Sequence, residues 1–457
     1  MDRPVRRAPA LTESALRERV ADGRIDTVVL AACDMQGRLV GKRFDARYFV
    51  DEVLPHGTEA CGYLLAVDVD MNTVGGYALA SWDTGYGDMA MTPDLATLRL
   101  LPWQDGTALA LADLSTVDGS AIGVAPRQVL HDQLARLAEH GLSAYVGTEL
   151  EFCVYDDSYE DAWRRGYREL TPANQYNVDY SILGTGRAEP LLRAIRTGMA
   201  GAGMTVESAK GECNLGQHEI AFRYTDALTT CDNHTIYKTG AKEIAAAQGR
   251  SLTFMAKPNS AEGNSCHIHC SLRDADGEPA LAGDGEHGFS PLMAQFLAGQ
   301  LHCQRDFALL YAPNVNSYKR YQDGSFAPTA VRWGRDNRTC ALRVVGHGPS
   351  LRVENRVPGG DVNPYLAVAG IIAAGLYGIE HELPLPEPCT GNAYAEPGPR
   401  VPGSLRDAAA LWADSGPARE AFGADVVAHY ANAARVELAS FDAAVTDWEL
   451  FRGFERM

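Results

Sequence analysis

Charged side chains at alternate positions in otherwise apolar segments most constrain how this chain can fold. Glu149 and Glu151 alternate with apolar residues in one segment, and His267 and His269 do so in another. Side chains two positions apart on a strand share one face, so each pair points the same way. Charged groups are rarely buried unless they are paired or bind a metal. The pattern therefore predicts an interior sheet with a polar cavity on one face.

Two further segments extend this polar set. Arg352, Glu354 and Arg356 alternate in a third strand-like segment, and Glu212 and Glu219 flank a glycine-containing turn. Together with a histidine, these carboxylates could ligate a metal. Oxygen-rich ligation with one imidazole suits Mg²⁺ or Mn²⁺ better than zinc, which prefers Cys and His in a tetrahedral shell. We expect divalent metal bridged by phosphate oxygens.

Arginines are concentrated late in the chain, and the planar guanidinium matches carboxylate and phosphate oxygens. They are Arg320, Arg338, Arg343, Arg352 and Arg356. Phosphoryl transfer to an anionic acceptor follows as a hypothesis. Taken singly, each feature has an ordinary explanation, because E-x-E is commonly a solvated strand face and arginines often form structural ion pairs. No P-loop is present, and the G-x-G-x-x-G match at 283–288 lacks a following Rossmann unit.

Length and composition favour a soluble protein of at least two domains. The chain has 457 residues, of which 46% are hydrophobic and 22% charged. A net charge of −18 argues against nucleic-acid or anionic-membrane partners and favours small-molecule substrates. The ten scattered cysteines and the absence of a secretory signal at 1–10 predict reduced thiols in the cytoplasm. The apolar run 366–379 is too short to span a membrane and reads as a buried helix.

The order of elements predicts a small β-rich domain followed by a mixed one. Short apolar runs such as 27–32 dominate the first hundred residues. A helix starting at Pro126 and a strand at 143–155 follow. Helix–strand pairs recur at 190–203 with 205–207 and at 232–250 with 252–255. We expect loops at 274–289 and 384–402 and paired helices from 405 to 457.

Taken together and in order, these segments resemble the type I glutamine synthetase family through nearly the whole chain. The matching segments are 87–89, 93–94, 147–152, 207–219, 254–258, 267–269, 316–320, 337–338, 352–356 and 363–365. The resemblance implies an α+β fold with a small N-terminal β-grasp domain, residues 1–118, and a larger C-terminal α/β catalytic domain, residues 119–457. It also implies a homo-oligomer, a dodecamer of two hexameric rings with active sites between subunits.

The resemblance also implies roles for individual residues. Six look like ligands of two Mg²⁺ or Mn²⁺ ions: Glu151, Glu212 and Glu354 for one, and Glu149, Glu219 and His267 for the other. Five fall where the family holds the co-substrate ATP: Glu207, His269, Ser271, Arg343 and Arg352. Four fall where it holds glutamate and the transferred phosphate: Gly263, Arg320, Arg338 and Arg356. Arg338 and Asp88 are the implied catalytic residues.

The chain departs from the ammonia-using pattern around the amine. Phe326 precedes Ala-Pro where such enzymes have a glutamate, and a phenyl ring cannot accept a proton. The alternative is a shifted flap in which Asp323 supplies the acid. Glu262 stands where an asparagine often lies, and Lys210 with the next glycine replaces a histidine pair. Asp68 and Asp70 are the candidates to replace the aspartate that the family lends to a neighbouring subunit.

These departures resemble the γ-glutamylpolyamine and γ-glutamylethanolamide synthetase relatives. They imply an ATP-dependent ligase that joins L-glutamate to a primary amine through γ-glutamyl phosphate, with Phe326 and Glu262 in the amine pocket. Loss of the flap acid favours ethanolamine over a polyamine. The alternatives are an ordinary glutamine synthetase that uses ammonia, a ligase for another acid, and a non-catalytic structural or regulatory member of the family.

Overall fold

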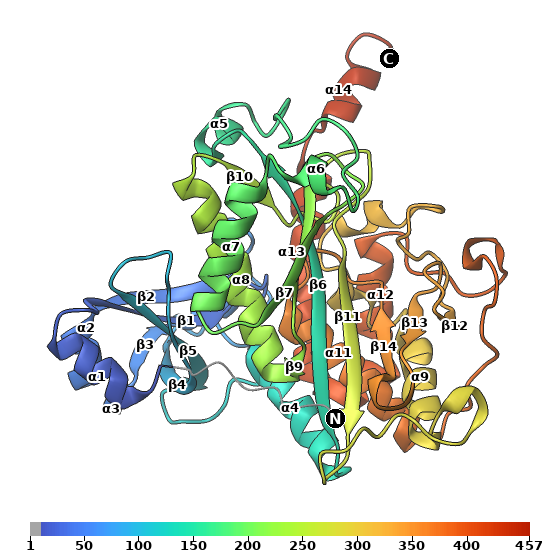
Figure 1. The fold of residues 1–457 in the computed structure, drawn as a ribbon, viewed down its shortest axis with the longest axis horizontal. Coiled ribbons are helices and arrows are strands. Elements are labelled where there is room, and N and C mark those ends of the chain that lie inside the picture. Colours follow the sequence, from blue (N-terminus) through green and yellow to red (C-terminus); the bar gives the residue numbers. More distant parts are fainter. Residues whose placement is uncertain (1–10) are drawn as a thin grey trace.

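The computed structural model describes residues 11–457, which form two sheets with separate hydrophobic cores (Figure 1). The 1–10 segment, where no secretory signal was predicted, lies outside the described residues. The smaller sheet and its helices occupy the N-terminal part, drawn in blue at the left of Figure 1. The helices and strands of this part are α1 Glu13–Ala21, β1 Thr27–Cys33, β2 Leu39–Asp45, α2 Ala46–Tyr48, α3 Leu54–His56, β3 Thr58–Cys61, β4 Asp88–Leu100 and β5 Thr107–Thr116.

The N-terminal sheet has the strand order β2-β1-β5-β4-β3. β1 and β5 pair in parallel, and the other neighbours are antiparallel. Its core contains Leu16 of α1 together with Val28 and Leu30 of β1, all fully buried. The side chain of Thr12 caps α1 by accepting a hydrogen bond from Ala15 N at 3.2 Å. The apolar run at 27–32 therefore forms a central strand, as the sequence predicts.

The larger part contains a nine-stranded sheet and most of the helices. Its strands are β6 Ser143–Tyr155, β7 Val206–Gly211, β8 Gln217–Phe222, β9 Thr225–Asp226, β10 Ser251–Thr253, β11 Cys266–Arg273, β12 Trp333–Arg335, β13 Leu342–Val345 and β14 Arg352–Asn355. Its helices are α4 Pro126–Glu139, α5 Tyr159–Arg164, α6 Ile182–Thr185, α7 Glu189–Gly201, α8 Ala227–Ala247, α9 Pro291–Cys303, α10 Ala308–Tyr311, α11 Pro364–Glu380, α12 Leu405–Asp414, α13 Gly416–Ala443 and α14 Asp447–Gly453. The strand order is β12-β13-β14-β11-β6-β8-β7, and β9 and β10 also pair with β6.

The interior of the larger part is built around α11, which packs against α9, α4 and α8. Gly299 of α9 and Gly378 of α11 allow the two helices to touch, because a Cβ atom at Gly299 would lie 2.1 Å from Ala374 O. The prediction that the apolar run 366–379 is a buried helix is confirmed. Among the described residues, no helix is long and apolar enough to cross a membrane.

A buried ion cluster joins the two parts. Arg127 of α4 contacts Asp94 of β4, Asp113 of β5 and Asp232 of α8. The Nη2–Oδ2 distance to Asp94 is 2.6 Å, and the Nε–Oδ1 distance to Asp232 is 3.1 Å. The Tyr365 hydroxyl also donates to Asp232 at 2.7 Å. These contacts fix the N-terminal sheet against the helices of the larger part.

Most predicted elements are present, with some shifted ends. The helix from Pro126 and the strand at 143–155 coincide with α4 and β6. α8 begins at Ala227 rather than 232, because Asp226 caps it by accepting from Thr229 N at 3.0 Å. The C-terminal segment forms three helices, α12 to α14, rather than a pair. The predicted α+β fold, a small N-terminal sheet domain and a larger catalytic domain, is confirmed; its boundary between 118 and 119 falls between β5 and α4 and stays a prediction.

Candidate active site

Neighbouring strands of the nine-stranded sheet bring the predicted acidic and histidine side chains together. β6 lies between β8 and β11. Glu151 of β6 is directly opposite Glu219 of β8, and Glu149 of β6 is directly opposite His267 of β11. Directly opposed residues of an antiparallel pair project from the same face. The alternating pattern therefore becomes one polar face of the sheet, as predicted.

A first acidic group contains Glu151, Glu212 and Glu219, each of which offers one oxygen within 4.8 Å of the others. Burial and the neighbouring carboxylates raise the pKa of Glu219 to about 8, although the charge of Lys210 opposes this. Ser265 N donates to Glu151 Oε2 at 2.7 Å and holds that carboxylate in place. Three carboxylates packed this closely repel each other, so the donor set fits a divalent cation that would relieve the repulsion.

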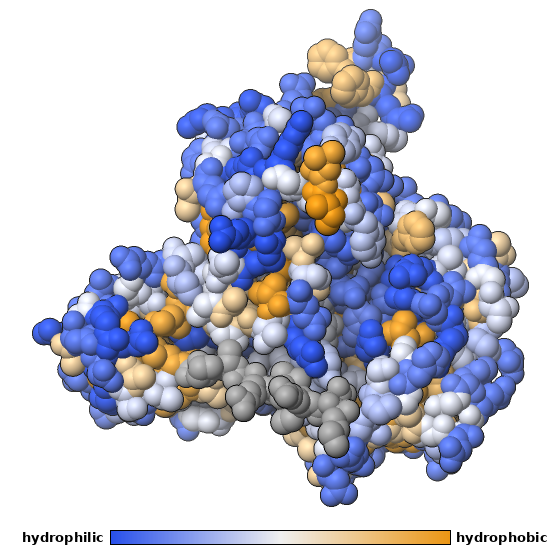
Figure 2. Space-filling model, in the orientation of Figure 1, coloured by the Kyte–Doolittle hydropathy of each residue, from blue (hydrophilic) through white to orange (hydrophobic). Residues whose placement is uncertain are grey.

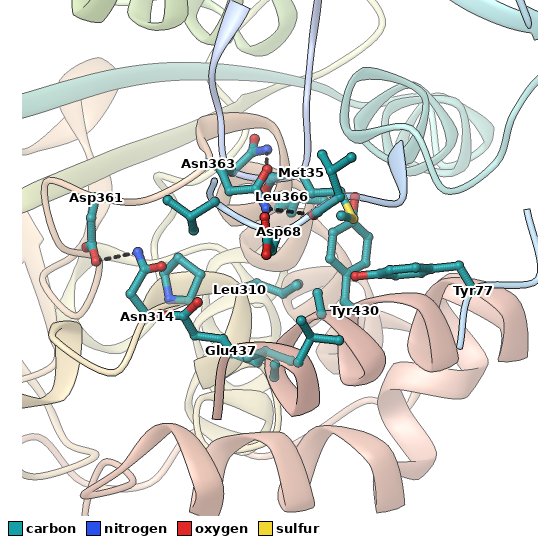
Figure 3. A pocket seen from close by; sticks show the side chains of 18 residues that line it. Met35, Asp68, Tyr77, Leu310, Asn314, Asp361, Asn363, Leu366, Tyr430 and Glu437 are labelled. Atoms are coloured by element: carbon teal, nitrogen blue, oxygen red, sulfur yellow. Dashed lines mark hydrogen bonds between the residues drawn. The ribbon is translucent and has the colours of Figure 1, made fainter. Parts of the chain in front are cut away.

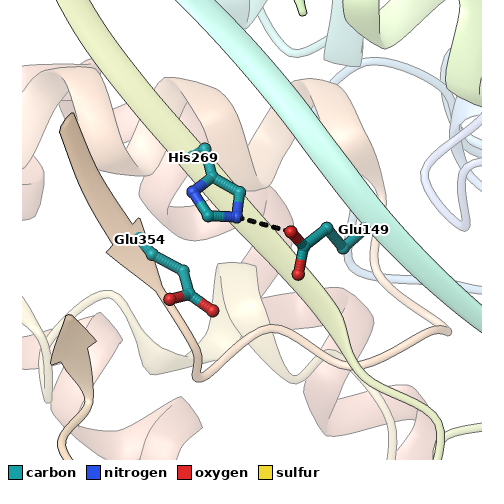
Figure 4. A group of neighbouring side chains, drawn as sticks. All are labelled: Glu149, His269 and Glu354. Carbon is teal, nitrogen blue, oxygen red and sulfur yellow. Dashed lines mark hydrogen bonds and ion pairs between the residues drawn. The ribbon is translucent and has the colours of Figure 1, made fainter. Parts of the chain in front are cut away.

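A second group contains Glu149, His269 and Glu354, shown in Figure 4. His269 Nε2 lies 2.9 Å from Glu149 Oε1. His267 is buried beside them, and its Nδ1 lies 3.5 Å from an oxygen of Glu149 and 3.5 Å from an oxygen of Glu354. Burial lowers the pKa of His267 and favours the neutral imidazole that can bind a metal. Its buried Nε2 has no hydrogen-bond partner within the described chain.

The side chains group differently from the division of the six ligands that the resemblance implies, although which residue binds which ion stays a prediction. The resemblance assigned Glu354 to the same metal as Glu151 and Glu212, and placed Glu219 in the other set. In the structure, Glu219 is the residue that lies with Glu151 and Glu212. The physical reason is strand order, since β8 is the immediate neighbour of β6, whereas β14 is separated from β6 by β11.

Two arginines hold Glu354, which is fully buried. Arg343 Nη1 donates to its Oε2 at 2.8 Å, and Arg356 Nη1 donates to its Oε1 at 2.6 Å. Burial opposes ionisation, but the positive charges around the carboxyl, Arg356 and Arg343 among them, lower the pKa of Glu354. Arg343 also bonds Asp336, at 3.0 Å from Nε. Both arginines are therefore ordered at the edge of the second group.

A buried arginine and a glycine form an adjoining cradle. Arg320 is 2% exposed; its Nη1 donates to Ser265 Oγ at 3.1 Å, and its Nη2 donates to Val357 O. A Cβ atom at Gly263 would lie 2.4 Å from Ala256 O and 2.7 Å from Arg320 Cγ, so only glycine fits there. The structure thus brings two of the four predicted glutamate-binding residues, Gly263 and Arg320, into contact.

An open cavity of ≈ 1240 Å³ adjoins the second group. Four of the five predicted ATP-binding residues line it: Glu207, His269, Ser271 and Arg352. Arg352 Nε donates to His269 Nδ1 at 3.2 Å. The fifth, Arg343, does not line the cavity, because its guanidinium is turned toward Glu354 and Asp336.

The two predicted amine-pocket residues both lie on exposed loops. Phe326 has a left-handed backbone, with φ of 58°, and a side chain that is 60% exposed. Its carbonyl accepts from Arg356 Nη2 at 3.4 Å, so its main chain lies beside the site while its ring faces solvent. Glu262 is also exposed, and its carbonyl accepts from Asn214 Nδ2 at 2.5 Å.

The two predicted catalytic residues are not brought together within one chain. Arg338 is exposed in the connection between β12 and β13. Asp88 is the exposed first residue of β4 in the N-terminal sheet, where it lines a hollow with Lys42 and Tyr63. The acidic groups of the larger sheet therefore form without Asp88 of the same chain.

A separate cavity of ≈ 710 Å³ lies between the N-terminal part and the helices of the larger part (Figure 3). Asp68, predicted as a possible replacement aspartate, lines this cavity, and its carboxylate accepts from Asn72 N at 2.8 Å. Asp361 and Glu437 lie on other walls, whereas the described lining contains neither arginine nor lysine. The cavity thus lacks the cations that phosphate binding needs, and Asp68 lies apart from the acidic groups of its own chain.

No role was predicted for Lys210, although it stands with Gly211 in place of a histidine pair. The Lys210 ammonium pairs with Glu212, and its Nζ lies 5.0 Å from the centre of the Tyr180 ring. Asp179 and Cys213 complete another group with Glu212. The available signal was a lysine two residues before a predicted metal ligand.

Comparisons with known proteins place these residues in a family context. The model of the glutamine synthetase catalytic domain matches residues 123–452. The chain is 70% identical to the gamma-glutamylethanolamide synthetase GlnA4 of Streptomyces coelicolor, over 99% of this chain and 97% of that protein. It is 37% identical to a glutamate–isopropylamine ligase of Pseudomonas sp, over 96% of each chain. A solved GmaS/ADP complex superposes with a TM-score of 0.84 at 28% identity, covering 96% of this chain and 99% of that one.

Proposed function

The chain belongs to the glutamine synthetase family, and we propose that it is a ligase that uses ATP to join L-glutamate to a primary amine, with ethanolamine as the favoured amine. The observation that carries this proposal is the 70% identity, along nearly the full length of both chains, to a protein named gamma-glutamylethanolamide synthetase. Relatives named for isopropylamine and putrescine, at 37% and 32% identity, support a γ-glutamyl amide as the product.

The family uses ATP and divalent metals, and the residues present fit two Mg²⁺ or Mn²⁺ ions per active site. Glu151, Glu212 and Glu219 would hold one ion. Glu149, His267 and Glu354, with oxygens and a neutral nitrogen close together, would hold the other. Bound cations supply charge neutralisation for the oxygens of the transferred phosphate. Close carboxylates with a raised pKa at Glu219 support this assignment.

The first chemical step is phosphoryl transfer to glutamate. ATP occupies the ≈ 1240 Å³ cavity with its phosphates toward His269 and Arg352. A γ-carboxylate oxygen of glutamate, held by Arg320 and Arg356, attacks the γ-phosphorus of ATP. The bond between that phosphorus and the bridging oxygen breaks, and ADP leaves with the electron pair. Arg338 and Arg343 neutralise the negative charge on the transferred group.

The second step forms the amide. The amine, as the free base, attacks the acyl carbon of γ-glutamyl phosphate, and the bond from that carbon to the phosphate oxygen breaks. Phosphate leaves and the nitrogen loses one proton. Phe326 and Glu262 flank the entry for the amine, and the exposed phenyl ring of Phe326 supplies no carboxylate to hold ammonium.

We propose a dodecamer of two hexameric rings in which Asp88 faces the site of an adjacent subunit. The C-terminal helix α14 supports this, since it projects from the body of the chain (Figure 1) and shows apolar side chains in Figure 2. Phe451 and Phe454 are 81% and 89% exposed. Ile182 and Leu183 of α6 are exposed as well, and large apolar side chains exposed in this way often contact another chain.

The test is ADP release by the purified protein with Mg²⁺, ATP and glutamate, with ethanolamine, methylamine, putrescine, spermine or ammonium as the amine. We expect ethanolamine to give the highest kcat/KM, with γ-glutamylethanolamide identified by mass spectrometry. Glutamine formed from ammonium as the main activity would instead establish an ordinary glutamine synthetase. No turnover with any amine, alongside an equally inactive Glu212→Ala control, would refute the ligase.

A further inference from the structure

Lys210 stands in one row with two carboxylates of the first acidic group. It lies on β7 directly opposite Glu219 of β8, and Glu219 is directly opposite Glu151 of β6. Residues opposed in this way share one face of the sheet. The Lys210 ammonium is therefore part of the polar face that carries the proposed metal ligands.

Two contacts fix the Lys210 side chain. Its ammonium pairs with Glu212, and its Nζ lies 5.0 Å from the centre of the Tyr180 ring, within the range of a cation–π contact. The lysine side chain is only 25% exposed. The Lys210 ammonium is therefore held beside the first acidic group.

The neighbourhood of Lys210 continues into the loop that carries Gly263. Asn214, two residues after Glu212, donates from Nδ2 to the carbonyl of Glu262 at 2.5 Å. Gln217 Nε2 donates to the carbonyl of Gly263 at 2.9 Å and to Glu151 Oε2 at 3.1 Å. The segment that follows Lys210 therefore connects the first acidic group to the loop at the proposed glutamate and amine end.

The charges of the first acidic group balance when the Lys210 ammonium is counted together with one divalent cation. Glu151, Glu212 and Glu219 carry three negative charges when ionised, and one divalent cation with the Lys210 ammonium supplies three positive ones. With a neutral side chain in place of Lys210, one negative charge would remain to attract a second cation. Asp179 and Glu262 also face this region, but both are exposed, so water and salt screen their charges more strongly.

We propose that Lys210 determines amine specificity by repelling a second ammonium at the far end of the amine and donating a hydrogen bond to a hydroxyl there. This inference rests on the proposed function and names its substrate class: amino alcohols in preference to diamines. The reacting nitrogen must be neutral in both classes, so the discrimination lies in the distal group. A distal hydroxyl accepts from the lysine, whereas a distal ammonium meets a like charge.

The sharpest test compares putrescine with 4-aminobutan-1-ol, which have the same chain length and differ only in the distal group. For the wild type, we expect the larger kcat/KM with the amino alcohol. Lys210→Met should raise the ratio of putrescine to amino alcohol about tenfold, since both the repulsion and the hydrogen bond are lost. Lys210→Arg, which keeps the charge, should keep the wild-type preference. Lys319→Met, which removes an exposed lysine outside the acidic groups, should leave the ratio unchanged.

Each outcome separates this inference from the proposed function. Amide products from the wild type with an unchanged ratio in Lys210→Met would overturn the role of Lys210 and leave the ligase intact. No amide product from the wild type would overturn the ligase itself. If Lys210→Met is folded but inactive, calorimetric binding of the two amines in the presence of Mg²⁺, ADP and glutamate decides. Compared with the wild type, Lys210→Met should bind putrescine more tightly relative to the amino alcohol. An unchanged ratio of the two binding affinities refutes the proposal.

A second readout needs no turnover. The Lys210 ammonium and a metal ion would both bind the Glu212 carboxylate, so replacing the lysine removes a competing cation. Calorimetry of the ATP-free protein should show tighter Mg²⁺ binding by Lys210→Met than by the wild type or Lys319→Met, by about tenfold. Equal affinities in all three proteins would contradict the placement of the lysine charge within the acidic group.

Discussion

Glu151 and Glu219 are direct cross-strand partners on β6 and β8, and both are buried. Like charges directly opposite each other on a sheet are destabilising. Burial and the surrounding carboxylates raise the pKa of Glu219 to about 8. In the metal-free chain, ionising both carboxylates is therefore unfavourable, and a bound divalent cation would remove this cost. Two predictions follow from this pair.

Glu219→Gln should stabilise the metal-free protein while abolishing activity. The amide keeps the size of the side chain and cannot ionise, so folding no longer has to protonate a carboxyl that is ionised in the unfolded chain; we expect this to add about 1–2 kcal/mol to the free energy of unfolding near neutral pH. The increase in Tm on adding Mg²⁺ should shrink, because a ligand is lost. Thermal unfolding with and without Mg²⁺ measures both effects. Glu160→Gln, an exposed charge on α5, is the control that should change neither.

The stability of the metal-free protein should fall as pH rises from about 4.5 to about 8. The folded-state pKa of Glu219 is raised from 4.5 to about 8, so the folded state binds the proton more tightly than the unfolded state. The stabilising contribution is complete below pH 4.5 and is lost as pH rises through the folded pKa. Mg²⁺ affinity should increase over the same window, because binding requires the ionised carboxylate. Denaturant titrations across this range measure how the free energy of unfolding changes with pH. The same pH dependence in Glu219→Gln would contradict the assignment of this effect to Glu219.

The sequence specified the polar face because alternation is a local property. β6 spans the predicted residues, and Glu149 and Glu151 share a face, since apolar Leu150 occupies the opposite, buried side. Nothing local records which strands are neighbours. The sequence could therefore not predict that Glu219 lies with Glu151 and Glu212, which depends on the strand order β14-β11-β6-β8.

Other features depend on contacts between distant segments. The pairing of Lys210 with Glu212 was within reach of the sequence, because the two residues lie two apart, but its contact with Tyr180 was not. The ion pairs of Arg127 reach aspartates up to 105 positions away in the chain, and each aspartate alone reads as a surface charge. The sequence could not predict the shape of the amine pocket, because Phe326 and Glu262 lie on exposed loops.

Arg127→Met should destabilise the chain strongly without touching the site. The substitution leaves Asp94 and the buried Asp232 without their shared cation, and breaking a buried ion pair costs about 3–5 kcal/mol. Chemical denaturation should show this loss as a lower midpoint. Arg136 lies on the same helix as Arg127 and forms a partly exposed ion pair with Glu380 of α11, so Arg136→Met should cost about 1 kcal/mol or less. Equal effects of the two substitutions would mean that the buried cluster does not tie the N-terminal sheet to the larger part.

Phe326→Glu should shift amine use toward ammonium. A carboxylate beside Arg356 and the proposed amine entry can bind ammonium and collect its proton, whereas the phenyl ring cannot. We expect the ratio of kcat/KM for ammonium to that for ethanolamine to rise about tenfold, a difference of about 1.4 kcal/mol. Phe326→Leu, which adds no charge, should keep the wild-type ratio. An unchanged ratio in Phe326→Glu would show that the side chain does not reach the pocket.

Phe451→Asp should disrupt the assembly while leaving the fold of each chain intact. The Phe451 side chain is 81% exposed on α14, and burying such a ring against another subunit contributes about 1.5–3 kcal/mol. An ion pair from Asp447 to Arg168 and a capping box at Thr446 hold the start of the helix, and neither involves the ring. Mass photometry should show the wild type as a dodecamer and Phe451→Asp as smaller species with an unchanged circular dichroism spectrum. Val117→Asp, an exposed apolar residue between β5 and α4, should leave the assembly whole. A full dodecamer in Phe451→Asp would exclude α14 as a contact that the assembly needs.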